Sequence, residues 1–171
     1  IEEVLGQDHL LGDGRLLNQL VASGHPTSLI LWGPAGVGKT TLARIIAVAT
    51  GSLLVELSAT ASGVKQVRQA ADQASRLRQH SGGRTVLFID EIHRFHKGQQ
   101  DALLPWVENG SIVLIGATTQ NPSFELVPPL LSRCRVVRLL TLSQEDLVRL
   151  LRRAVDTPLP RGLGASVVEL P

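Results

Sequence analysis

The feature that most limits how this chain can fold is a glycine-rich octapeptide placed between two apolar segments. Residues 33–40 read Gly-Pro-Ala-Gly-Val-Gly-Lys-Thr, which matches the pattern G-x-x-x-x-G-K-[ST]. An apolar run at 28–32 precedes the octapeptide, and a segment with helical periodicity at 41–47 follows it. Strand, loop and helix in this order form the context that a phosphate-binding P-loop requires. The sequence therefore predicts a buried strand that ends in an anion-binding turn.

The residue types of this loop suit a nucleoside triphosphate. Glycines let the backbone curl around an anion with its N–H groups pointing inward. The N-terminus of the following helix adds partial positive charge. We expect Lys39 to reach the β and γ phosphates and the hydroxyl of Thr40 to bind Mg²⁺. The residues expected to contact ATP in this segment are Gly33, Pro34, Ala35, Gly36, Val37, Gly38, Lys39, Thr40 and Thr41.

Two acidic residues end another apolar segment. Residues 86–91 read Val-Leu-Phe-Ile-Asp-Glu, the Walker B pattern. Asp90 is expected to hold Mg²⁺ through its water shell, because this ion prefers carboxylate, phosphate and water oxygens. Glu91 is expected to polarise the attacking water as a general base. Two adjacent acids with separate roles favour hydrolysis over simple phosphate binding.

Polar residues after the fourth apolar segment suggest a sensor of the γ-phosphate. Residues 116–121 read Gly-Ala-Thr-Thr-Gln-Asn. Thr119 is the first choice for a hydroxyl that orients water, and Thr118 is the second. The alternative is a loop threonine that bonds its own backbone.

Three further polar residues near these motifs have open roles. Ser58, at the end of the second apolar segment, either bonds Glu91 or caps the next segment. His93 and His96 have helical spacing, but no third metal ligand lies nearby in the sequence. We expect both histidines at the surface near Glu91.

Arg133 lies in the segment Ser-Arg-Cys-Arg at 132–135, between a short helix and the fifth apolar segment. An arginine there can project from the subunit surface. In a ring it would enter the site of a neighbouring subunit and neutralise charge on the γ-phosphate, as an arginine finger. Arg135 is the second choice for this role, and a plain surface ion pair is the remaining alternative.

Short apolar segments alternate with longer amphipathic ones, which predicts the α/β class. Continuous apolar strands are typical of a buried parallel sheet, and alternation with helices predicts βαβ units with helices on both faces. We therefore expect a three-layer αβα core around a five-stranded parallel sheet. The expected strands are 29–32, 53–57, 85–89, 112–117 and 136–139, and the expected helices are 40–49, 64–78, 98–107 and 126–132. Pro105 should kink or shorten the third helix.

The pattern changes near residue 142, where Ser143 and the acids after it predict the start of another helix. We expect an ATPase core at 1–141 and the beginning of a helical lid at 142–171. The chain has 171 residues and starts at Ile1. We expect it to be a piece of a longer protein.

Composition excludes some classes of protein. No apolar run reaches the roughly 18 residues of a membrane span, so we expect no membrane association. A single cysteine, Cys134, cannot form an internal disulfide, which fits a reducing compartment. Net charge is only +2, although residues 133–161 hold seven arginines against three acids. This basic end could contact phosphates, or it could be a solvated helix face with contacts between subunits.

In this order, the P-loop, the acidic pair, the threonine sensor and the Ser-Arg-Cys segment resemble an AAA+ ATPase of the clamp-loader branch. Five segments point to one family within this branch: 4–11, 28–34, 90–95, 99–105 and, most specifically, 116–125. Together these segments resemble the RarA/MgsA family, which includes the Werner helicase-interacting ATPase of eukaryotes. The similarity runs from residue 4 to residue 155.

This resemblance implies the strand order 5-1-4-3-2 and a DNA-dependent ATPase that acts at stalled or damaged replication forks. The implied partners are DNA, single-stranded DNA-binding protein, other replication or repair proteins, and further copies of the same chain. The resemblance also places Val4, Leu5 and Gly6 near the adenine. Arginine outnumbers lysine fourteen to three, which is typical of a GC-rich genome. We therefore expect a bacterial cytoplasm, close to the nucleoid, with a eukaryotic nucleus as the alternative. Ala35 and Val37 depart from the residues usual in the family but leave the backbone cradle possible.

Other interpretations remain open at this point. Within the same class, the chain could be a clamp-loader subunit or a branch-migration motor. A different class is a nucleotide-gated module whose ATP only switches its affinity for a protein partner. A small-molecule P-loop kinase is a third class, although such kinases seldom carry paired Walker B acids followed by a Ser-Arg-Cys segment.

Overall fold

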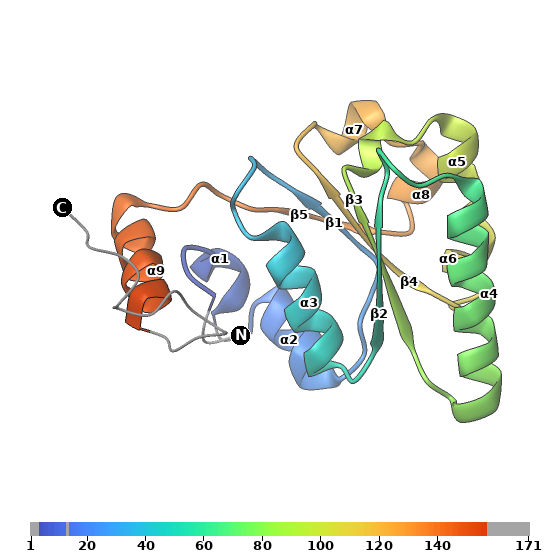
Figure 1. Ribbon diagram of the computed structural model, residues 1–171, viewed down its shortest axis with the longest axis horizontal. Helices are drawn as coiled ribbons and strands as arrows, with labels where there is room; N and C mark the ends of the chain where they lie inside the picture. Colours follow the sequence, from blue (N-terminus) through green and yellow to red (C-terminus); the bar gives the residue numbers. More distant parts are fainter. Residues whose placement is uncertain (1–3, 13, 157–171) are drawn as a thin grey trace.

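A parallel five-stranded sheet lies between two layers of helices (Figure 1). The structure, a computed structural model, describes residues 4–12 and 14–156. Its strands are β1 (Leu29–Trp32), β2 (Leu53–Ser58), β3 (Thr85–Asp90), β4 (Val113–Thr118) and β5 (Arg135–Arg138). Neighbouring strands pair in the order β2-β3-β4-β1-β5, and every pair is parallel. The expected α/β class, the sheet order and all five strands are confirmed, with each boundary within one residue.

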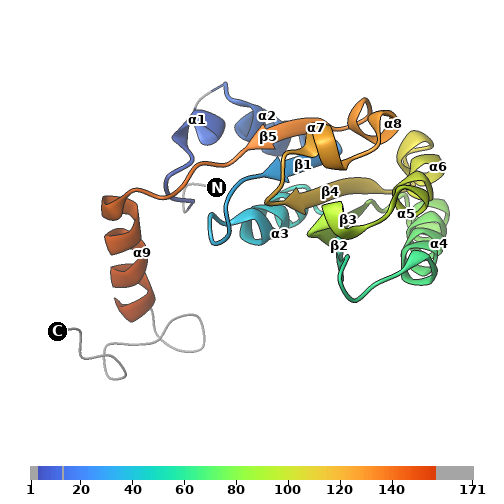
Figure 2. The same cartoon turned by 90° about the horizontal axis from the view of Figure 1, so that it is seen from above.

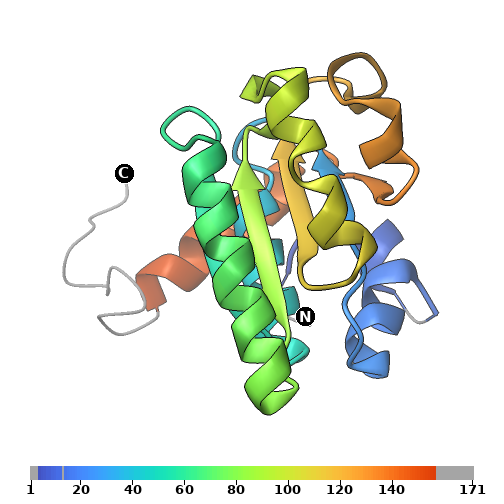
Figure 3. The same cartoon turned by 90° about the vertical axis from the view of Figure 1, so that its right-hand side faces the viewer.

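Each face of the sheet is covered by its own set of helices. One face of the sheet is covered by α1 (Asp8–Leu11), α2 (Leu16–Ser23) and α3 (Lys39–Ala49). The opposite face is covered by α4 (Val64–Ser81), α5 (Lys97–Asp101), α6 (Leu104–Glu108), α7 (Pro122–Glu125) and α8 (Pro128–Leu131). Figure 3 looks onto this second layer, with the long α4 in green. A one-turn 3₁₀ helix, η1 (Ile92–Arg94), follows β3.

Helix α9 (Gln144–Asp156) stands away from both layers, beyond α1 (Figure 2). Ser143 caps it as expected, because its hydroxyl accepts from the backbone N–H of Asp146 at 3.1 Å. The rest of the expected lid, residues 157–171, lies outside the described residues. None of the helices in the described ranges has the length and apolar content that crossing a membrane requires.

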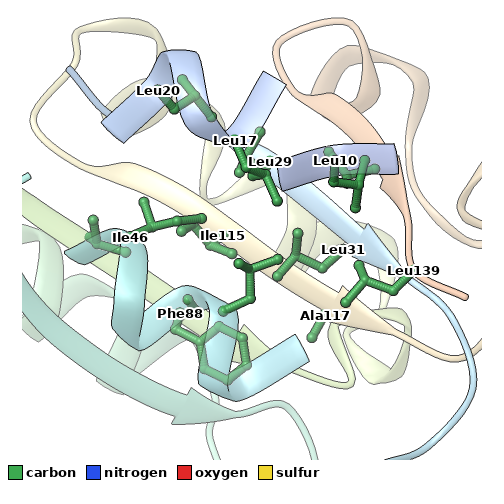
Figure 4. Packing of buried hydrophobic residues seen from close by; sticks show 14 of the residues in the cluster. Leu10, Leu17, Leu20, Leu29, Leu31, Ile46, Phe88, Ile115, Ala117 and Leu139 are labelled. Carbon is green, nitrogen blue, oxygen red and sulfur yellow. The ribbon is translucent and has the colours of Figure 1, made fainter. Parts of the chain in front are cut away.

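Alternate side chains along each central strand enter opposite cores. In β1, Leu29 and Leu31 pack against the α1–α3 layer, whereas Ile30 packs against the α4–α8 layer. The same alternation runs through β3, where Phe88 joins the first core (Figure 4) and Ile89 the second. Burial on both faces explains why these strands appear in the sequence as continuous apolar runs.

Two of the expected helices need correction, and α1, α2 and α7 were not expected. Helices α1 and α2 are short, and each lies between two glycines of the sequence. The helix expected at 98–107 is two helices, α5 and α6, because Pro105 falls in the first turn of α6 and cannot donate within a longer helix. The helix expected at 126–132 is reduced to α8. The chain before it forms α7, whose N-terminus is capped by Asn121.

The first P-loop glycine is required by the packing of the sheet. A Cβ on Gly33 would lie 2.5 Å from the backbone oxygen of Leu139, at the exit of β5. The backbone N–H of Leu139 also donates to Trp32 O at 2.7 Å, so the two chains cannot easily move apart. Gly33 therefore allows β1 and the end of β5 to approach closely.

We expect Gly33→Ala to lower the free energy of unfolding by about 1–3 kcal/mol, because the added methyl overpacks against backbone. Urea denaturation would measure the change. Gly98→Ala is the matched control, since its Cβ would meet only His96 side-chain atoms at 3.4 Å or more. That control should be neutral or stabilising by up to about 1 kcal/mol. Equal effects of the two substitutions would contradict this account of Gly33.

Candidate nucleotide site

Three strand ends meet at one edge of the sheet. Strand β4 lies between β1 and β3, with Trp32 level with Thr118 and Ile89 level with Gly116. In a parallel sheet all carboxyl ends share an edge, so the P-loop, the two acids and the threonines emerge side by side. A hollow of about 340 Å³ opens there. It is lined by Ala35, Gly36, Gly38, Lys39, Thr40, Thr41, Asp90 and Glu91.

The P-loop residues divide into two groups. Six of the nine predicted ones line this hollow, and among them Gly36 and Gly38 have φ angles of 77° and 94°. Only glycine adopts such angles without strain. Gly33 and Val37 instead pack into the interior, and Pro34 contributes its carbonyl to Lys39. The P-loop motif therefore contains two kinds of residue: some line the hollow, and others hold the loop in shape.

Lys39 is the first residue of α3 and the main cation of the hollow. Its ammonium donates to the carbonyls of Gly33 at 2.8 Å and Pro34 at 2.7 Å, and the residue is only 8% exposed. Burial lowers the pKa of this ammonium, and the nearby carboxylates of Glu91 and Asp90 partly oppose that shift. Reduced hydration strengthens its attraction for an anion in the loop.

Thr40 and Asp90 supply the oxygens that Mg²⁺ would need. Both line the hollow, one with a hydroxyl and the other with a carboxylate. This donor set fits Mg²⁺, which binds to proteins through one or two such oxygens and keeps phosphate and water as its other ligands. Within the described residues there is no group of three His, Cys, Asp or Glu side chains that could form an all-protein metal cage.

Glu91 lies in a strained turn and contacts the end of β4. Among the described residues it is the one non-glycine with a positive φ, at 51°. Its Oε2 accepts a long hydrogen bond of 3.5 Å from Thr119 Oγ1. Thr118 Oγ1 instead bonds Gln120, accepting from its N–H at 3.0 Å and donating to its carbonyl at 3.2 Å. Of the two sensor candidates, Thr119 reaches the acid and Thr118 bonds the backbone.

The structure bears on the open role of Ser58 and corrects the surface position expected for His93. Of the two alternatives for Ser58, the bond to Glu91 is not formed, because Ser58 Oγ bonds Thr60 Oγ1 at 2.8 Å. The side chain of His93 is only 8% exposed, and its Nδ1 lies 3.1 Å from Glu91 Oε2. His96 does lie at the surface, where it caps α5 by accepting from Gln99 N. The turn at Glu91, which brings His93 back toward β4, could not be read from the sequence.

Arg133 lies at the surface after α8, with 38% of its side chain exposed. Within its own chain it donates to the Pro129 carbonyl at 2.7 Å and forms an ion pair with Glu108 at 2.5 Å. A single chain thus contains the surface ion pair considered above, and Arg133 lines no part of the hollow. Arg135 is exposed at the start of β5.

The segment expected near the adenine does not line the hollow. Val4, Leu5 and Gly6 are half-buried, and a Cβ on Gly6 would lie 2.5 Å from the Leu142 side chain. The next residue, Gln7, is fully buried and bonds both backbone groups of Leu140 at 2.8 and 3.1 Å. The segment is thus attached to the exit of β5, and its contact with adenine stays a prediction.

Gln7 and Gln100 are two anchors that motif reasoning missed. Gln100 is 1% exposed and donates to the carbonyls of Phe95 and Glu125, while its Oε1 accepts from Val127 N at 2.8 Å. It joins α5 to the segment that leads to Arg133. A buried glutamine with all its partners resembles any surface glutamine in a sequence, so periodicity gave no signal.

The fold and the site define a P-loop nucleotide-binding protein. Its P-loop follows β1, and its paired acids lie at the end of β3, two strands away in the sheet. The chain belongs to the ATPase family associated with various cellular activities (AAA), whose family model matches residues 29–142.

Two curated relatives identify the branch of the family that this chain resembles. The chain is 48% identical over 171 residues to replication-associated recombination protein A of Escherichia coli K12, covering all of this chain and 38% of that protein. It is 48% identical over 160 residues to ATPase WRNIP1 of Dictyostelium discoideum, covering 93% of this chain and 18% of that one. The resemblance to the RarA/MgsA family is confirmed, and the chain spans well under half of these relatives.

A solved structure supports the fold. The Thermotoga maritima RuvB Holliday junction branch migration motor matches 91% of this chain and 52% of its own, with a TM-score of 0.72 and 30% identity.

Cys134, next to Arg133, should be unreactive. Burial raises the pKa of its thiol to about 12. At pH 8 we expect alkylation to be about 10³-fold slower than in the unfolded chain, because only the thiolate reacts. Iodoacetamide labelling followed by mass spectrometry, with and without urea, would measure this. Comparable rates in the two conditions would contradict protection of the partly buried thiol by the fold.

Proposed function

We propose that this chain is the ATP-hydrolysing core of a protein that acts on DNA at replication forks. The main support for this proposal is that one hollow is lined by Lys39, Thr40, Asp90 and Glu91. The identity to a replication-associated recombination protein supports the choice of DNA as the substrate on which hydrolysis is used.

Each residue of the hollow has a distinct task in this proposal. The loop around Gly36 and Gly38, together with Lys39, binds the phosphates of ATP. Thr40 and Asp90 hold Mg²⁺, which neutralises phosphate charge when bound. Glu91 accepts a proton from the attacking water, and Thr119 helps to fix the position of the Glu91 carboxylate.

Completion of the site by a second copy of the chain is part of the proposal. One chain offers a base, a metal site and a P-loop cation, whereas its exposed Arg133 lies after α8 and outside its own hollow. A ring would bring Arg133 of one subunit to the γ-phosphate held by the next. Single-stranded DNA-binding protein and other repair proteins are the proposed partners, in a bacterial cytoplasm or a nucleus.

A branch-migration motor is the second candidate, favoured by the similarity to RuvB. A nucleotide-gated binding module is the third. An intact Glu91 argues against a pure switch, since such a module needs ATP binding but no general base.

We expect forked DNA to raise the ATPase rate of the full-length protein several-fold, as measured by phosphate release. A wild-type rate that forked DNA does not change would favour the nucleotide-gated module.

We expect Glu91→Gln to retain ATP binding and to lose about 10²–10⁴-fold in kcat, because the general base is removed without changing the shape of the site. The same phosphate-release assay would measure this loss. Unchanged hydrolysis in the variant would remove Glu91 as the base.

We expect Arg133→Ala to lower kcat by on the order of 10³-fold with little change in ATP affinity, because the finger acts on the transition state. Mixing this variant with Glu91→Gln subunits tests whether Arg133 acts on ATP bound to its own chain or to a neighbouring chain. If Arg133 acts in trans, mixed rings regain activity although each variant alone is inactive. If the mixture stays inactive, the arginine acts within its own chain. Arg135→Ala is the comparison, since a loss there instead would identify the second choice.

A further inference from the structure

The imidazole of His93 is buried between the proposed base and the end of strand β4. Its Nδ1 lies 3.1 Å from Glu91 Oε2 and 2.9 Å from Thr118 Oγ1. The His93 side chain is 8% exposed, against 33% for that of Glu91. One ring nitrogen thus contacts both a carboxylate and the hydroxyl of the last residue of β4.

Proton accounting fixes which nitrogen of His93 carries hydrogen. A carboxylate only accepts, so a bare Nδ1 would set two lone pairs against each other across 3.1 Å. The Thr118 hydroxyl has one proton, and the carbonyl of Gln120 accepts it at 3.2 Å. The Gln120 N–H, in turn, donates to that hydroxyl oxygen at 3.0 Å. The contacts are consistent when Nδ1–H donates, shared between Thr118 and Glu91.

The backbone builds this arrangement at some strain. Glu91 adopts the left-handed conformation, with φ 51° and ψ 45°, where a side chain with a Cβ is disfavoured. The turn leads directly into η1, which returns His93 toward β4. Strained residues of this kind persist when their surroundings determine their position, and they cluster at functional sites.

We propose that His93 is a positioning residue for Glu91, an inference that rests on the proposed role of Glu91 as the base. The Nδ1–H of His93 holds Oε2 of the carboxylate, with a second, longer contact from Thr119. The other oxygen, Oε1, is then the one available to a water molecule. Through Thr118, the position of the base is tied to the strand end that carries the proposed γ-phosphate sensor.

Kinetics of two variants of the full-length protein test this role. His93→Phe removes the donor and keeps the ring volume. We expect kcat to fall at least about tenfold, a part of what a general base contributes, while the affinity for ATP stays within about twofold. His93→Asn should recover most of the rate, because its amide nitrogen is bonded to Cγ as Nδ1 is. His96→Asn, which keeps a capping side chain at the surface, should match the wild type.

Several outcomes would overturn the proposal. One is a Phe variant that turns over ATP as fast as the wild type or faster. Another is an Asn variant that is as slow as the Phe variant and denatures at the same urea concentration as the Phe variant. Restoring the donor would then have changed nothing, and the histidine would serve packing alone. Glu91→Gln in the same assay separates the two ideas. If that variant is inactive and His93→Phe is fully active, the base stands and only the positioning role fails.

The protonation of His93 gives a readout that needs no variant to fold. Nitrogen NMR of the ¹⁵N-histidine-labelled full-length protein distinguishes protonated from bare ring nitrogens. Assignment uses the signal lost in His93→Asn. A protonated Nδ1 supports the proposal, and a bare Nδ1 with a protonated Nε2 contradicts it.

Discussion

The parallel hydrogen-bonded pairing of β1, β4 and β3 is the interaction on which the candidate site depends. It sets the ends of three strands at one edge, so that Thr40 and Asp90 line one hollow and Thr119 contacts Glu91, although these residues are far apart in the sequence. Both faces of these strands are buried, which makes the edge a rigid platform. The parts of the site that lie outside this platform are short: the P-loop and the turn at Glu91.

The same pairing explains why most of the fold could be predicted from the sequence. A strand buried on both faces must be apolar throughout, and β1, β3 and β4 were visible as such runs. The edge strands β2 and β5 are partly exposed, and each was found from a short apolar segment. The order of the strands was not visible in this way and came from the family resemblance. Helix limits were less predictable, because Pro105 divides one expected helix and the cap at Asn121 starts another. Helices α1 and α2 are too short for their periodicity to stand out.

The predictability of the site follows a similar division. Residues that act through backbone geometry or a fixed spacing, such as Lys39 and Asp90, were found from their motif. Most residues that act through side-chain contacts across the fold were not, although Thr119 was chosen from its place after the fourth apolar segment. The side chains of Ser58 and His93 can both donate a hydrogen bond to a carboxylate. Of these two, the left-handed turn at Glu91 brings only His93 into contact with the Glu91 carboxylate. Gln7 and Gln100 were missed for the same reason, since their roles depend on backbone groups of distant segments.

The position of Arg133 suggests how a site shared between subunits could assemble without a large energetic barrier. In a single chain the guanidinium is held by Glu108 and the Pro129 carbonyl, which limits its conformational freedom. A partly exposed ion pair of this kind contributes about 0–1 kcal/mol. A triphosphate carries more negative charge than one carboxylate and offers bidentate oxygens that match the guanidinium. A neighbouring subunit with bound ATP could therefore outcompete Glu108, whereas a subunit without it would leave the arginine on its own chain. The strength of the contact between subunits would then depend on the nucleotide, even though no residue of the interface changes.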